Sequence, residues 1–190
     1  QVSLNPWPHI QREPVGMVVI PWVSFYLGGW MMGWASAPYD PYWARRYPRR
    51  SAWMSLAGPA ANFAIVIASG LLIEAGVFGG ILKLSRSTAF DRIVVATSSG
   101  PMEGVAALLS VLFSLNLLLG AFNLLPFPPL DGFSVLGIFL PESATLKLMD
   151  FRDSLGGMAM IGILIAWRAF DYIFEPVFMT GLRLLYWPHF

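Results

Sequence analysis

The chain has 190 residues, of which 56% are hydrophobic and only 12% charged, a balance that is unusual for soluble domains and indicates a membrane protein. A net charge of +1, without a basic stripe interleaved with aromatic residues, excludes nucleic-acid binding. The absence of cysteine excludes disulfides, thiolate metal sites and cysteine nucleophiles, so a metal would need His, Asp or Glu ligands.

Four apolar segments are long enough to compare with the roughly 20 helical residues that cross a bilayer. They are residues 15–35, 52–78, 105–140 and 156–174. Proline and glycine interrupt the first segment, which therefore fits either a full span or a re-entrant hairpin. We predict an all-α polytopic membrane protein with these four segments, forming a single domain over residues 1–190.

The loop before the second segment is rich in arginine. Arg45, Arg46, Arg49 and Arg50 predict a cytoplasmic position by the positive-inside bias. Alternation then places residues 79–103 on the far side and residues 141–154 back in the cytoplasm.

Within the second segment, small residues recur at helical spacing. They are Ala57, Ala61, Ala64 and Ala68. Small side chains allow helices to approach closely in lipid, so we expect this face to lie inside the bundle, against a neighbour.

The third segment cannot be one helix, because 36 helical residues would extend about 54 Å, well beyond the bilayer core. Three prolines between residues 126 and 129 predict an extended stretch over residues 125–130, and Asp131 then begins a second helical piece that reaches Leu140. A carboxylate in such a segment is costly and indicates a functional site with a partner. The alternative is that Asp131 only caps the second helix.

Asn123 adds a second polar group to the same break. Its amide both donates and accepts hydrogen bonds, so it could bind extended backbone. The alternative is an ordinary hydrogen bond between helices.

Three runs in order resemble the site-2 protease family of zinc intramembrane metalloproteases. Residues 122–132 (Phe-Asn-Leu-Leu-Pro-Phe-Pro-Pro-Leu-Asp-Gly) are similar to its asparagine, proline and Asp-Gly signature, and this run is the most specific. Residues 56–62 (Leu-Ala-Gly-Pro-Ala-Ala-Asn) are similar to its small-residue helix. Residues 3–10, with 14–16 and 33–35, resemble the segment that short bacterial members carry after their HExxH helix.

The resemblance implies a zinc ion held by two histidines of an HExxH helix and by Asp131. It also implies that Asn123 steadies the unwound substrate backbone or its developing oxyanion. The implied substrate is a transmembrane segment, and the implied location is the bacterial inner membrane, as a multi-pass protein. The family's usual Gly and basic residue after the Asp-Gly pair are replaced here by Phe133 and Ser134.

The chain contains no HExxH. His9 and His189 are its two histidines, and neither has a second histidine four residues away. His9 matches a family position that does not bind zinc and is interpreted as structural. We expect the HExxH helix to lie upstream of Gln1, and the 190 residues alone to be inactive.

Two functions remain open from the sequence. Either the intact parent is a zinc endopeptidase of membrane segments, or it is a catalytically inactive family member that serves as an accessory subunit of a larger membrane complex. Its partners would be membrane lipids with a transmembrane substrate in the first case, and with other membrane subunits in the second. A third idea, transport by the broken helix, lacks the paired broken segments of inverted repeats.

Overall fold

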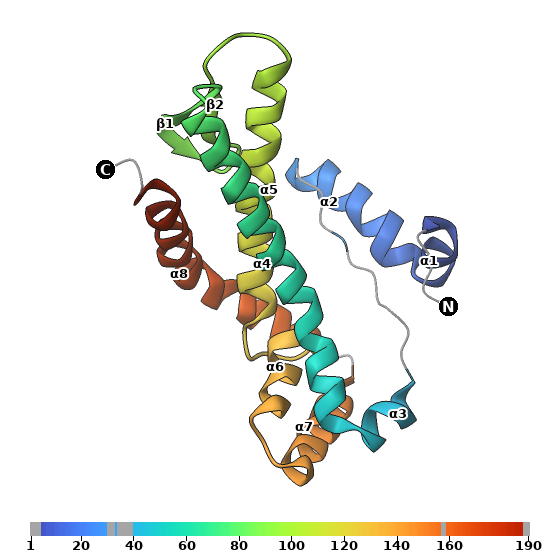
Figure 1. Cartoon of the computed structure of the whole chain (residues 1–190). Helices are drawn as coiled ribbons and strands as arrows, with labels where there is room; N and C mark the ends of the chain where they lie inside the picture. The colour runs from blue at the N-terminus through green and yellow to red at the C-terminus, as the bar shows by residue number, and fades with distance from the viewer. Residues whose placement is uncertain (1–4, 30–32, 34–39, 157–158, 188–190) are drawn as a thin grey trace. The chain divides into compact units, whose positions relative to one another are not determined.

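The computed structural model describes residues 5–29, 33, 40–156 and 159–187 (Figure 1). The chain divides into two compact units, Gln1–Ala44 and Arg45–Phe190. Asn123 and Asp131, the predicted site residues, both belong to the second unit.

The first unit is helical where it is described. It contains α1 (Pro6–Arg12), a π-helix (Val15–Val19) and α2 (Ile20–Gly28). Gly29 ends α2 in the left-handed region, at φ 73°, and its N–H binds the carbonyl of Phe25. The first apolar segment continues through Ala35 into positions outside the described residues, so the choice between a span and a re-entrant hairpin stays a prediction.

Two long helices form the frame of the second unit. After the short α3 (Pro41–Arg46), α4 (Pro48–Phe78) and α5 (Pro101–Asn123) are both long and apolar enough to cross a membrane. They pack side by side (Figure 1). Two of the four predicted segments are thus confirmed as candidate spans by length and composition.

Four further helical elements follow α5 in the chain. They are α6 (Asp131–Val135), a 3-10 turn (Leu136–Ile138), α7 (Glu142–Leu155) and α8 (Ala159–Tyr186). The fourth predicted segment thus falls largely within α8, which continues through Pro176 well past the predicted end; residues 157 and 158 lie outside the described part.

The expectation of an all-α protein is wrong at one place. Residues predicted as a loop form an antiparallel hairpin of β1 (Leu82–Ala89) and β2 (Arg92–Ala96), in which Leu84 pairs with Val94. Ile93 and Val94 are almost completely buried, in a core shared with α4, α5 and α8. Branched residues favour a strand that packs on a neighbouring element, and here that packing stabilises a hairpin too short to be stable alone.

Two side chains attach β2 to the helices. The Ser110 hydroxyl of α5, fully buried, accepts hydrogen bonds from the Ile93 and Val94 N–H groups at 3.1 and 3.2 Å. The Tyr186 hydroxyl of α8 donates to the Ile93 carbonyl at 2.9 Å. The hairpin is therefore fixed between α5 and α8 through its backbone.

Replacing Ser110 with alanine is expected to lower the free energy of unfolding by about 2 kcal/mol, because two buried N–H groups lose their acceptor. Ser114, one turn further along α5, is also fully buried, and its hydroxyl has no hydrogen-bond partner within the described residues. Ser114→Ala should therefore leave stability unchanged or raise it by about 1 kcal/mol, because it removes a buried hydroxyl that lacks a partner in the described part of the chain. Unfolding of both variants in detergent checks this, and equal losses would contradict the role given to Ser110.

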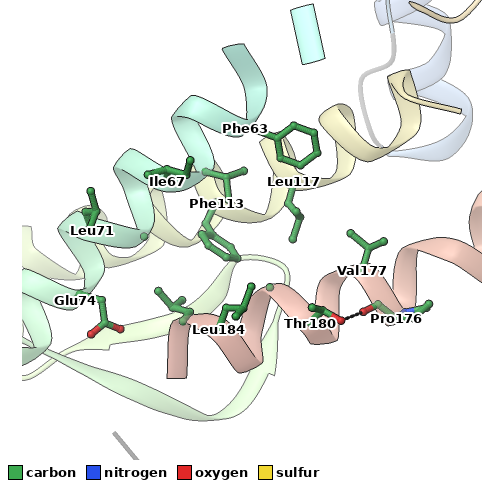
Figure 2. A pocket seen from close by; sticks show the side chains of 14 residues that line it. Phe63, Ile67, Leu71, Glu74, Phe113, Leu117, Pro176, Val177, Thr180 and Leu184 are labelled. Atoms are coloured by element: carbon green, nitrogen blue, oxygen red, sulfur yellow. Dashed lines mark hydrogen bonds between the residues drawn. The ribbon is translucent and has the colours of Figure 1, made fainter. Parts of the chain in front are cut away.

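Large apolar side chains are exposed along the helices of the second unit, among them Ile67, Leu71 and Leu184. These residues border an apolar groove of about 650 Å³ between α4 and α8, with Phe113 and Leu117 of α5 at its base (Figure 2). Exposed apolar surface of this extent is suited to lipid rather than to water.

One expectation fails: Ala57, Ala61, Ala64 and Ala68 are exposed rather than packed inside the second unit, because α4 contacts α5 through a different face.

Candidate active site

The predicted break in the third segment is confirmed. The helix α5 ends at Asn123 and α6 begins at Asp131. The connection is not extended as predicted, because the Phe127 N–H binds the Leu125 carbonyl at 2.9 Å and the Leu130 N–H binds the Phe127 carbonyl at 2.8 Å. Such short-range bonds form a chain of turns, which supplies partners to backbone that the prolines exclude from a helix.

Buried side chains anchor this loop at both ends. Leu125 and Leu130 are 7% and 8% exposed and pack with Ala166 and Phe170 of α8. At Gly162 the backbone of α8 lies directly against the loop, because a Cβ there would overlap the Pro128 carbonyl oxygen. The loop is therefore held by α8 as well as by its own turns.

The glycine of the Asp-Gly pair lies directly against the end of α5. A Cβ on Gly132 would overlap the Leu124 carbonyl and would lie 2.6 Å from the Leu125 carbonyl oxygen. No side chain fits there without moving backbone. Gly132 thus lets α6 start close to the end of α5, which sets the position of Asp131.

The Asp131 carboxylate is half-buried and faces α4. Its Oδ2 lies 3.2 Å from the position that a Cβ on Gly58 would occupy. Two of the runs singled out in the sequence, residues 56–62 and 122–132, therefore meet at this point. The N-cap of α6 is Leu130 and no described side chain makes a capping hydrogen bond, but Asp131 is the acidic residue of the first turn, so the alternative that it only stabilises the start of α6 stays open.

Asn123 is the last residue of α5 and is half-buried. It lies at one end of the turn loop and Asp131 at the other. The predicted role of Asn123 toward a substrate is not tested by this arrangement and stays a prediction.

The structure does not test whether either histidine lies near Asp131. His9 belongs to α1 of the first unit, and His189 lies outside the described residues. Across residues 5–29, 33, 40–156 and 159–187, no three His, Cys, Asp or Glu side chains are grouped so that they could hold a metal ion. A catalytic zinc site needs three protein ligands and one open position. This part of the chain offers Asp131 alone and does not fit a complete zinc site.

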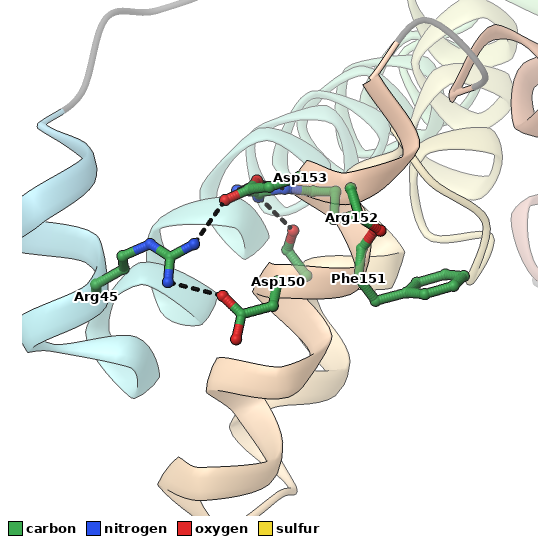
Figure 3. Close-up of polar contacts among 7 residues, drawn as sticks. Arg45, Asp150, Phe151, Arg152 and Asp153 are labelled. Carbon is green, nitrogen blue, oxygen red and sulfur yellow. Dashed lines mark hydrogen bonds and ion pairs between the residues drawn. The ribbon is translucent and has the colours of Figure 1, made fainter.

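A polar network missed by sequence reasoning connects α3, α7 and α6 (Figure 3). Arg45 contacts Asp150 at 2.7 Å and Asp153 at 3.1 Å, Arg152 contacts Asp153 at 3.1 Å, and Arg152 donates to the Ser134 hydroxyl at 3.3 Å. The hydrogen bonds to Asp150 and Asp153 raise the pKa of Arg45 above its ordinary value.

The network brings a cation to the position where the sequence departs from the family pattern. Ser134 stands in place of the family's basic residue, and the Arg152 guanidinium of α7 reaches it from outside that motif. Exposed ion pairs contribute little to stability, so the network is a set of contacts that links α7 to α3 and α6 rather than a main source of folding energy. The contacts of Arg45 with Asp150 and Asp153 bring the arginine loop and α7 together, while the predicted cytoplasmic position of both stays a prediction.

The fold and the loop define a class of protein: helical, with two apolar helices suited to a membrane and a half-buried carboxylate at a proline-broken turn between helices. The model of the family described as peptidase family M50 matches residues 20–166, and the chain belongs to this family, the site-2 proteases. It is 26% identical over 183 residues to "Putative zinc metalloprotease YwhC" of Bacillus subtilis (strain 168), covering 95% of this chain and 72% of that protein. No solved structure matches the chain.

Family membership supports a membrane-embedded, metalloprotease-like protein. The match to the family model extends well beyond the Asp-Gly run, because the matched residues include α4, the hairpin, α5, α6 and α7.

Proposed function

We propose that the complete protein is a zinc-dependent endopeptidase of transmembrane segments in the bacterial inner membrane, and that Asp131 is one of its metal ligands. The observation that supports this most is the position of Asp131, whose carboxylate is held at the Gly58 surface of α4 by the turn loop and by Gly132. The site-2 protease family and the name of the B. subtilis relative supply the chemistry.

When bound, zinc supplies a Lewis acid that brings the pKa of a water molecule near 7. The remaining ligands and the general base would come from a segment outside the described residues. The exposed small-residue face of α4, which includes Ala57 and Ala61, is next to Gly58 in the sequence and would allow such a helix to approach closely.

The other roles fall to groups at the same break. Asn123, with one acceptor and two donors, would pair with an unwound substrate strand. The turn loop would exclude water from one side of the site, because Leu125 and Leu130 are fixed in the core. Through Ser134, Arg152 would keep α6 in register with α7.

The test of this function is cleavage of a model transmembrane substrate by the complete gene product in detergent and in vesicles. We expect cleavage that a chelator abolishes and that added zinc restores, and no cleavage by residues 1–190 alone. A complete protein that holds no metal and purifies with other membrane subunits would support the accessory-subunit alternative instead.

Gly58→Ala is expected to weaken metal binding by about 10-fold with little loss of stability. The added methyl group would meet Oδ2 of Asp131 at 3.2 Å and displace the carboxylate by a few tenths of an ångström. Gly70→Ala in the same helix is the matched control, because its Cβ would make only ordinary contacts at 3.6 Å. Zinc titration of the complete protein measures the difference. Equal zinc affinities in the two variants would show that Gly58 does not influence the metal site.

A further inference from the structure

Three exposed arginines surround the start of α4: Arg46, Arg49 and Arg50. Within the described residues none of them forms an ion pair with a carboxylate, whereas the neighbouring Arg45 is engaged by Asp150 and Asp153. The four arginines of the loop therefore differ in role. One attaches α7, and three concentrate positive charge at the end of a 31-residue apolar helix.

Two of the three are held on one ring. The guanidinium carbons of Arg46 and Arg50 lie 5.6 and 4.9 Å from the centre of the Tyr47 ring. Cation–π contacts of this kind are attractive and limit the freedom of both side chains. The two guanidinium groups are therefore presented together rather than dispersed.

The position along α4 is that of a membrane surface. Trp53 is 60% exposed and follows Arg49 and Arg50 by four and three residues, so it lies on the same side of the helix one turn further in. Tryptophan favours the interface between lipid and water, and arginine favours the headgroup layer beyond it. The N-terminus of α4, which is the positive end of the helix dipole, points toward the same layer. The start of α4 therefore adds to the positive charge of the arginines, and a bound anion would neutralise it.

We propose that Arg46, Arg49 and Arg50 bind the phosphate groups of anionic phospholipids and fix this end of α4 at the bilayer surface. Among the described residues, the opposite end of the second unit has no comparable cluster of arginines. There Lys83, Arg86 and Arg92 are interspersed with Asp91 and Glu103, so charges of both signs are present. The proposed attraction between arginines and lipid phosphates therefore acts at one end of the second unit. It does not depend on the proposed protease activity.

The test uses the full chain in neutral detergent, titrated with phosphatidylglycerol or phosphatidylcholine, with lipid retention measured by native mass spectrometry and thermal stability followed in parallel. Each arginine near an anionic surface contributes about 1 kcal/mol, so the triple variant Arg46→Gln, Arg49→Gln, Arg50→Gln should bind phosphatidylglycerol about 100-fold more weakly. The triple variant Arg86→Gln, Arg92→Gln, Arg183→Gln removes the same charge at the other end and should change binding less than about threefold.

Two further measurements test the proposal even if the first triple variant folds poorly. The triple lysine variant of Arg46, Arg49 and Arg50 keeps the charge and should retain most of the binding, while salt should weaken phosphatidylglycerol binding to the unaltered chain. Inorganic phosphate should not reproduce the stabilisation. Equal loss in both glutamine variants, equal retention of the two lipids, salt-independent binding, or full stabilisation by phosphate alone would each overturn the proposal.

Discussion

Replacing Gly132 with alanine is expected to destabilise the chain by about 3 kcal/mol or more, the largest effect of any conservative change at the site. The new methyl group would overlap the Leu124 carbonyl and crowd the Leu125 carbonyl, and both belong to backbone that the turn hydrogen bonds hold. The loop or α6 must then move, and Asp131 moves with it. Unfolding in detergent and the elution profile of the variant measure the loss.

Gly104 in α5 provides the control for this change. A Cβ there would meet no atom within 4 Å. Alanine is the better helix former, so Gly104→Ala should leave stability unchanged or raise it by up to about 1 kcal/mol. If Gly132→Ala were as stable as Gly104→Ala, the close approach of α6 to the end of α5 would be wrong.

Asp131→Asn is expected to reduce cleavage by the complete protein by roughly 1000-fold or more while leaving the fold intact. An amide has nearly the shape of the carboxylate but lacks the charge that a zinc ligand supplies, and loss of the metal removes several kcal/mol of transition-state stabilisation. Asp91→Asn makes the same chemical change on the exposed hairpin and should leave the rate unchanged. Comparable rates for the two variants would show that Asp131 is not required.

The break that creates the site could be predicted from local chemistry. Proline lacks a backbone donor and disfavours helix in the residue before it, so the end of α5 and the restart at Asp131 follow from Pro126 to Pro129. The conformation between them could not. Whether such backbone runs extended or turns on itself depends on where Leu125 and Leu130 find a core, and that core belongs to α8.

The errors elsewhere have the same origin in tertiary contacts. Ile93 and Val94 are branched residues that favour a strand, but the short hairpin also depends on hydrogen bonds from its backbone to other elements. The Ser110 hydroxyl accepts from the Ile93 and Val94 N–H groups, and the Tyr186 hydroxyl donates to the Ile93 carbonyl. The small residues of α4 are exposed in the second unit, and α4 contacts α5 instead through side chains such as Phe63, which lies against Gly120. Arg152 reaches Ser134 from 18 residues away, a distance in sequence that no motif covers.

We propose that Asp131 is a zinc ligand and that the other zinc ligands come from outside the described residues. Metal analysis of the complete gene product, purified without added chelator, tests it most directly when the unaltered protein and Asp131→Asn are compared. We predict about one zinc per protein in the first and almost none in the second, with both folded. Full zinc occupancy in Asp131→Asn, or no zinc in the unaltered and folded protein, would contradict the account.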